Sequence, residues 1–253
     1  MVSRRTLMRS LAACALMGCA PQSKGDAGVE AADDDAACAE GEMPRWVTYA
    51  GRIMVCDNSI GVGYHGLVGG FRAPMSTLLT ARGIQHTWVG PYSDAYGAHR
   101  SVSGISAVQQ SSALQTDCET YDPRIVILGY AENDLGGAGG GQSRTPAQAI
   151  DSMTSCIRWA RAGAPQAIVL VRTVVVPQTN GIPGYYARRD LFAEYNTLVP
   201  AMCAAEGAIM VDIGAPTTSD GLHFDDTPTG YPAAAAELVA ASVAALPGGP
   251  LSA

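Results

Sequence analysis

Apolar and polar positions along the chain alternate between two patterns. Some short runs, such as residues 124–128, are apolar at nearly every position, which is typical of parallel strands buried on both faces. Longer stretches, such as residues 67–81, carry apolar residues at helical spacing. This alternation predicts a parallel sheet covered by helices on both faces. The segments expected as strands are 52–56, 86–89, 124–128, 167–176 and 208–213, and those expected as helices are 67–81, 106–114, 146–162, 189–206 and 233–246.

Polar residues with catalytic chemistry follow several of these strands. In parallel α/β sheets, functional groups collect where strands end and helices begin. Ser59 follows the first strand, Asn133 follows the strand at 124–128, and Asp220 and His223 precede the last helix. These residues supply the nucleophile, base, orienting carboxylate and oxyanion donor that a serine esterase needs. Each also fits a turn or a helix cap when taken alone, so the hypothesis depends on the set.

A glycine pattern at residues 61–66 suggests a different function. It matches G-x-G-x-x-G, which is typical of dinucleotide-binding folds when it directly follows a strand. Here Ser59 and three other residues separate the strand from the first glycine, and the next strand ends in Gly90 rather than in an acid for the ribose. We therefore infer that these glycines allow the backbone to pack closely behind Ser59.

Five blocks along the chain resemble, in order, those of the SGNH (GDSL-like) hydrolases. The resemblance covers roughly residues 51–245 and includes a segment of the acetylxylan-esterase-like branch. The matching blocks are DNSIGVG at 57–63 with GDSIT-x-G, GGFRAPM at 69–75 with GGYR-x-x-L, HRSVSG at 99–104 with HEGHSG, YDPRIVILGYAEND at 121–134 with YDPDVVLLxxGTND, and DGLH at 220–223 with DGLH.

The resemblance implies an α/β, flavodoxin-like fold: a three-layer α/β/α sandwich with a central parallel sheet. It implies that Ser59 attacks an acyl carbonyl, that His223 exchanges the proton, and that Asp220 orients His223. The N–H groups of Ser59 and Gly104 and the side chain of Asn133 are expected to form the oxyanion hole. The expected substrates are O-acetyl esters of carbohydrates or small esters, with no metal and no organic cofactor.

Two blocks depart from the family pattern beside the site. Asp57 and Asn58 stand where the family has Gly and Asp, and Ala131 and Glu132 stand where it has Gly and Thr. We expect Asp57 and Glu132 to bring two carboxylates near the site and to disfavour anionic substrates. The departures leave open a catalytically impaired surface lipoprotein that binds a glycan or a partner. A lipase or lysophospholipase of the same fold is a third hypothesis, although no long apolar lid segment is visible.

The first 19 residues have the features of an export signal. Arginines precede an apolar run at 11–17 that is too short to span a bilayer. The run leads into Leu-Met-Gly-Cys, which resembles a bacterial lipobox with Cys19 as the lipidated residue. We expect an exported protein of the bacterial cell envelope that meets the membrane only through this lipid anchor. An ordinary cleaved signal, giving a periplasmic or secreted protein, is the alternative.

Composition divides the remainder of the chain. Residues 20–43 are polar, acidic and rich in alanine, which predicts a flexible tether, and residues 44–250 suit a single hydrolase domain. The net charge of −7 and the lack of a basic cluster after the signal argue against nucleic-acid binding.

Seven cysteines occur, of which five follow the signal. An oxidising compartment would allow up to two disulfides and one free thiol among them. We expect Cys118 to pair with Cys156, because both are predicted at the same end of the sheet, and Cys56 to be a buried thiol. No cysteine or histidine spacing suits zinc.

Overall fold

The computed structural model describes residues 51–64, 68–137, 143–178 and 182–246. The predicted signal, tether and lipidated Cys19 lie outside these residues. None of the described helices combines the length and apolar composition that crossing a membrane requires.

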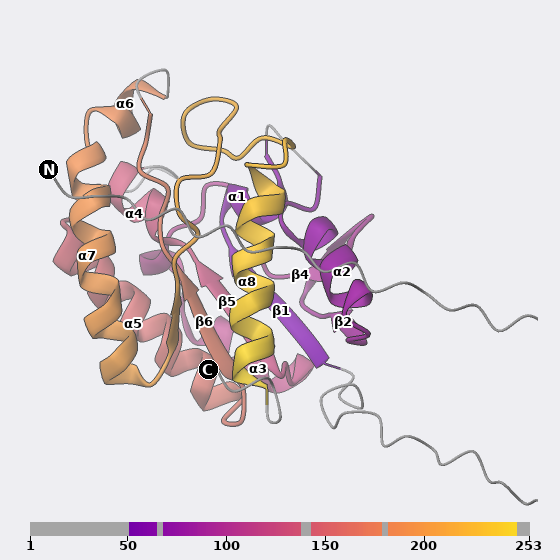
Figure 1. The fold of residues 1–253 in the computed structure, drawn as a ribbon. Helices are drawn as coiled ribbons and strands as arrows, with labels where there is room; N and C mark the ends of the chain where they lie inside the picture. The colour runs from indigo at the N-terminus through magenta and orange to yellow at the C-terminus, as the bar shows by residue number, and fades with distance from the viewer. Residues whose placement is uncertain (1–50, 65–67, 138–142, 179–181, 247–253) are drawn as a thin grey trace, which may run out of the picture. The chain divides into compact units, whose positions relative to one another are not determined.

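A parallel sheet forms the centre of the fold, as predicted (Figure 1). Its strands, in spatial order, are β2 (His86–Trp88), β1 (Gly51–Asp57), β5 (Ile125–Gly129), β6 (Ile168–Arg172) and β7 (Ile209–Val211). An antiparallel hairpin, which the sequence pattern did not predict, is formed by β3 (Tyr92–Asp94) and β4 (Gly97–His99).

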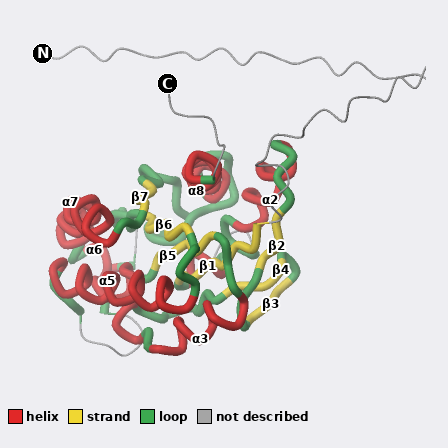
Figure 2. The backbone as a smooth tube through the Cα atoms, turned by 90° about the horizontal axis from the view of Figure 1, so that it is seen from below, coloured by secondary structure: helices red, strands yellow, loops and turns green. Residues whose placement is uncertain are grey.

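Helices cover both faces of the sheet, which confirms the predicted three-layer α/β/α architecture (Figure 2). The helices on one face are α3 (Ser112–Tyr121), α5 (Pro146–Gly163) and α7 (Arg189–Glu206). Those on the opposite face are α2 (Arg72–Ala81) and α8 (Tyr231–Ala245). The short helical segments in the connecting loops are α1 (Ser59–Val62), the 3-10 helix η1 (Ala107–Gln109), α4 (Ala131–Gly136) and α6 (Pro183–Tyr186).

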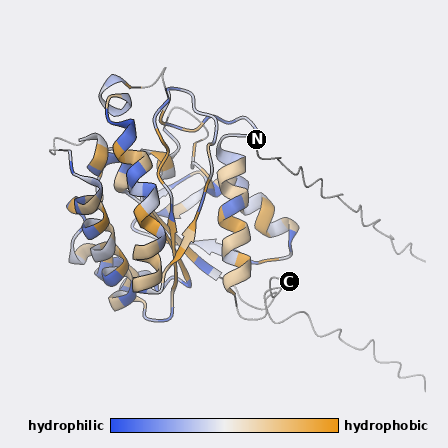
Figure 3. Cartoon of the chain, turned by 60° about the vertical axis from the view of Figure 1, so that its left-hand side comes forward, coloured by the Kyte–Doolittle hydropathy of each residue, from blue (hydrophilic) through white to orange (hydrophobic). Residues whose placement is uncertain are grey.

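The central strands are apolar at nearly every position because each of their faces is buried. Successive side chains of a strand point to opposite faces. In β1, Met54 and Cys56 pack with α3, α5 and α7, whereas Ile53 and Val55 pack with α2 and α8. Figure 3 shows the resulting hydrophobic colouring of the strands between the helices.

Two predicted helices and one predicted strand have other bounds in the structure. The helix expected at 67–81 begins at Arg72, because Gly69 and Gly70 have φ angles of 84° and 55° and take the chain out of helical conformation. The helix expected at 106–114 is split into η1 and α3 by the extended residues Gln110 and Ser111. The strand expected at 167–176 is shorter and ends at Arg172.

The expected Cys118–Cys156 disulfide is wrong. Both residues are buried free thiols, as are Cys56 and Cys203. The Cys156 sulfur lies 3.7 Å from the Ala107 carbonyl oxygen, while the Cys118 side chain packs against Gly163 at the end of α5. Gly163 is about 10 Å further along the helix than Cys156 at 1.5 Å per residue, too far for the geometry of a disulfide.

Candidate active site

Ser59 lies at the junction of β1 and α1. Asn58 caps the short helix, because its side-chain oxygen accepts the N–H of Ile60 at 2.9 Å. Gly63 ends the helix after one turn with a φ angle of 90°. The D-N-S-I-G sequence therefore folds as a strand, a cap and a single helical turn, which places Ser59 at the carboxyl edge of the sheet.

The predicted triad residues form a continuous hydrogen-bonded chain. The distance from Ser59 Oγ to His223 Nε2 is 2.8 Å, and that from His223 Nδ1 to Asp220 Oδ2 is 2.7 Å. Ser59 and His223 are 164 positions apart in the sequence, so the fold itself brings them together. The half-exposed ring of Tyr64 lies edge-on to the His223 ring, with 5.1 Å between centroids.

The spacing of Asp220 and His223 corresponds to a tight turn. The second carboxylate oxygen of Asp220, Oδ1, accepts the backbone N–H groups of Leu222 and His223 at 3.1 and 2.8 Å. Partial burial acts to raise the pKa of Asp220, but the hydrogen bonds from His223 and Leu222 outweigh it and lower the pKa below its usual value. The group facing the imidazole is therefore an ionised carboxylate in a fixed orientation.

Asn133, the predicted oxyanion donor, projects from α4. Its Nδ2 donates to the carbonyl of Ile105 at 2.7 Å, and its Oδ1 accepts the hydroxyl hydrogen of Tyr185 at 2.7 Å. An amide nitrogen carries two hydrogens, so the bond to Ile105 leaves a second N–H that an oxyanion could accept. Tyr185 was not identified from the sequence, and nothing in its local sequence pattern points to this role.

Gly104 lies in the loop between β4 and η1. Its φ angle is 79°, and a Cβ placed on it would meet no atom within 4 Å. The loop is tied to the end of β1, because the Val102 N–H donates to the Asp57 carbonyl at 3.0 Å. A hollow of about 340 Å³ adjoins Gly104, with Val102 and Ile105 among its lining residues.

The carboxylates of Asp57 and Glu132 do not face the site as unpaired charges. Both are buried, and both form ion pairs with the buried guanidinium of Arg172 at the end of β6. Arg172 offsets one of the two negative charges, and the expected disfavouring of anionic substrates stays a prediction. Arg172 was not anticipated from the sequence, although a charged residue within an apolar strand is a recognisable signal for a buried partner.

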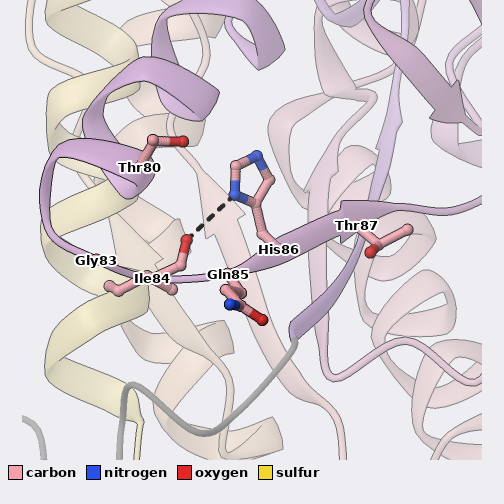
Figure 4. Close-up of a pocket in the computed structure, with 6 residues that line it drawn as sticks. All are labelled: Thr80, Gly83, Ile84, Gln85, His86 and Thr87. Atoms are coloured by element: carbon pink, nitrogen blue, oxygen red, sulfur yellow. Dashed lines mark hydrogen bonds between the residues drawn. The ribbon is translucent and has the colours of Figure 1, made fainter. Parts of the chain in front are cut away.

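A separate pocket lies away from the triad. It has a volume of about 530 Å³ and is lined by residues around His86, at the amino end of β2 (Figure 4). The His86 Nε2 and Trp88 Nε1 atoms lie 3.0 and 2.8 Å from the hydroxyl oxygen of Ser76. The triad lies at the opposite, carboxyl edge of the parallel sheet, so this pocket does not belong to the candidate active site.

The comparison with protein families identifies the class of this chain. Residues 58–236 match the model of the GDSL-like Lipase/Acylhydrolase family. The chain therefore belongs to this family and is a carboxylic ester hydrolase of the GDSL type, which confirms the resemblance inferred from its sequence blocks.

Solved structures of similar fold include two carbohydrate esterases and an aryl esterase. A family 3 carbohydrate esterase from Clostridium thermocellum is 20% identical over 74% of this chain and 92% of its own, with a TM-score of 0.59. One from Talaromyces cellulolyticus is 18% identical, with coverages of 76% and 96% and a TM-score of 0.59. The M. smegmatis aryl esterase is 14% identical, with coverages of 78% and 100% and a TM-score of 0.62. At these identities the likeness establishes a shared fold. No curated protein matches the chain.

Proposed function

We propose that this protein is an exported serine esterase that removes O-acetyl groups from carbohydrates or from small esters. The observation that carries the proposal is the hydrogen-bonded chain from Ser59 Oγ through His223 to Asp220. Its expected place is the bacterial cell envelope, held by a lipid on Cys19. Release of the protein from the membrane fraction by Cys19→Ser would test the anchor.

The geometry supports a two-step acyl transfer. His223 Nε2 takes the proton of Ser59 as Oγ attacks the acyl carbonyl, and the resulting oxyanion binds the N–H groups of Ser59, Gly104 and Asn133. Collapse of this intermediate breaks the ester bond, and His223 returns the proton to the leaving alcohol. Water then attacks the acyl-serine by the same route and releases the acid. Asp220 stabilises the positively charged imidazole that forms transiently in each step.

Two observations support a carbohydrate substrate. Two of the structures of similar fold are described as family 3 carbohydrate esterases, and a third as an acetyl esterase with acetate ion. Tyr64 also presents a half-exposed ring beside His223, the residue that would protonate the leaving alcohol. An aromatic face combined with a polar tip suits the mixed apolar and hydroxylated surface of a sugar.

The test compares Ser59→Ala with the wild type on acetylated oligosaccharides and on p-nitrophenyl acetate. Acetate release is expected to fall by about 10³-fold or more, because the covalent route is lost. Ser112→Ala, an exposed serine at the start of α3, is the matched control and is expected to retain wild-type activity. Activity that persists in Ser59→Ala would eliminate Ser59 as the nucleophile.

Two further measurements separate the alternatives. A fluorophosphonate probe is expected to label Ser59 in the wild type, whereas failure to label would favour a catalytically impaired binding protein. The ratio of activity on acetyl and long-chain acyl esters distinguishes an acetylesterase from a lipase or lysophospholipase of the same fold.

A further inference from the structure

Three of the residues that depart from the family pattern, Asp57, Asn58 and Glu132, belong to one buried group around Arg172. We call Asp57, Asn58, Glu132 and Arg172 the Arg172 cluster; each is at most 1% exposed. The guanidinium donates to both oxygens of Asp57, at 2.8 Å from Nε and 2.7 Å from Nη2. It also donates to both oxygens of Glu132, which accepts a further bond from Asn58 Nδ2 at 2.8 Å.

The cluster connects the two segments that carry the predicted nucleophile and oxyanion donor. Asp57 is the last residue of β1, and Asn58 caps the helical turn that begins with Ser59. Glu132 immediately precedes Asn133 in α4. Movement of the cluster would therefore shift both Ser59 and Asn133, since each directly follows a residue of the cluster.

The backbone between these segments is held by the same groups. The Gly129 carbonyl at the end of β5 accepts from Arg172 Nη2 at 2.9 Å and from Asn58 Nδ2 at 3.1 Å. A Cβ on Gly129 would lie 2.3 Å from Arg172 Nε and 2.5 Å from Asp57 Oδ2, so a larger residue would displace the ion pair. With a further bond to the Thr173 carbonyl, all five guanidinium N–H groups have acceptors.

We propose that Arg172 is a positioning residue. It fixes the position of Ser59 through Asp57 and Asn58, and it fixes the position of Asn133 through Glu132. The departures at Asp57, Asn58 and Glu132 are then linked, because each takes part in the hydrogen bonds around Arg172. This inference rests on the proposed esterase function, because it assigns the cluster a role in that reaction.

Stability alone is a weak reason for such a cluster. A buried ion pair is often replaceable by apolar residues without loss of stability, because desolvation of the charges offsets their attraction. Burial and the neighbouring Glu132 carboxylate raise the pKa of Asp57 to about 6 in spite of its bonds to Arg172. A guanidinium with all its N–H groups bonded fixes the positions of the groups around it. This matters for Ser59 and Asn133, because small misplacements of reacting groups lower turnover strongly.

The first experiment replaces the guanidinium of Arg172 but keeps its positive charge. Arg172→Lys is expected to lower kcat about 10- to 100-fold at nearly unchanged KM, because one ammonium cannot reproduce the forked bonds to Asp57 and Glu132. Arg72→Lys is the matched control: Arg72 is equally buried and forked on Asp94, in the β3–β4 hairpin. It is expected to lose stability but to keep kcat within about twofold of the wild type.

The second experiment separates stability from positioning. The triple variant Asp57→Asn, Glu132→Gln, Arg172→Met removes every charge of the cluster and is expected to approach wild-type stability in urea while kcat stays low. Recovery of kcat in the triple variant, or a folded Arg172→Lys with wild-type kcat, would overturn the positioning role. A wild type that hydrolyses no ester and does not label with fluorophosphonate would instead refute the proposed function.

Discussion

The Asn133 amide can act on an oxyanion only if its orientation is fixed, and the Tyr185 hydroxyl fixes it from one side. Burial raises the pKa of Tyr185, so the hydroxyl stays protonated and donates to Oδ1. Tyr185→Phe is expected to lower kcat about fivefold to tenfold with little change in KM, in line with the loss of about 1 kcal/mol for one hydrogen bond.

Tyr195→Phe provides the control for this change. The Tyr195 hydroxyl is buried and has no hydrogen-bond partner among the described residues, so its removal is expected to leave kcat unchanged and not to lower stability. Steady-state kinetics on p-nitrophenyl acetate measure both variants. Equal kcat values for the two variants would show that the hydroxyl of Tyr185 does not hold the amide.

At the same scale, the sequence revealed some site residues and hid others. Asp220 and His223 were predictable because their spacing fits one turn, and Ser59 because it directly follows a buried strand. Arg172 had a signal, a charge within an apolar run, but its partners lie far away in the sequence. Tyr185 had no such signal in the sequence, because its role depends on how α6 packs against α4.

Among the elements, the loop from β4 to η1 offers the sharpest test. Gly104 has a φ angle of 79° and open space where a Cβ would lie, so Gly104→Ala affects backbone conformation rather than packing. The strain is expected to cost about 1 kcal/mol and to turn the N–H away from the oxyanion, lowering kcat about tenfold or more.

Gly83 allows a matched comparison, because it follows α2, has a φ angle of 70° and is equally open. Gly83→Ala is expected to lose similar stability in urea unfolding but no activity. If both variants lose kcat to the same extent, strain alone explains the loss and the Gly104 N–H has no special role.

Elements with explicit end signals were predicted well. Helix α5 begins with a capping box of Thr145 and Gln148 around Pro146, and α7 ends at the left-handed Gly207. Segments whose ends depend on tertiary contacts were missed. Gly70, for example, lies so close to the Ile60 carbonyl that a side chain there would collide with it, and helical periodicity gives no sign of this.

Across the whole molecule, buried carboxylates make stability depend on pH. Desolvation raises the pKa of Asp134 from 3.8 to about 6, despite hydrogen bonds from the N–H groups of Ala107 and Val108. Between these pH values the folded protein keeps a proton that the unfolded chain has lost. The contribution of Asp134 to stability therefore falls as pH rises from about 4 to about 6.

Asp134→Asn removes this titration. The free energy of unfolding of the wild type minus that of the variant is expected to be larger at about pH 4.5 than at about pH 7, as measured by urea unfolding. Parallel stability profiles for the two proteins would contradict the raised pKa. Asp57 titrates in the same range and adds to the wild-type slope in the same direction.

The Arg172 cluster also bears on how this chain could have diverged from its relatives. Replacing Asp57 or Glu132 alone by the family-type residue would leave the guanidinium buried with fewer acceptors, and replacing Arg172 alone by an uncharged residue would leave two buried carboxylates without a cation. Single substitutions in the cluster are therefore expected to destabilise the protein, a case of epistasis in which the effect of one substitution depends on the others. Compared one position at a time, the segments at 57–59 and 131–134 look like weakened family motifs. Considered together, Asp57, Asn58 and Glu132 form one hydrogen-bonded group with Arg172.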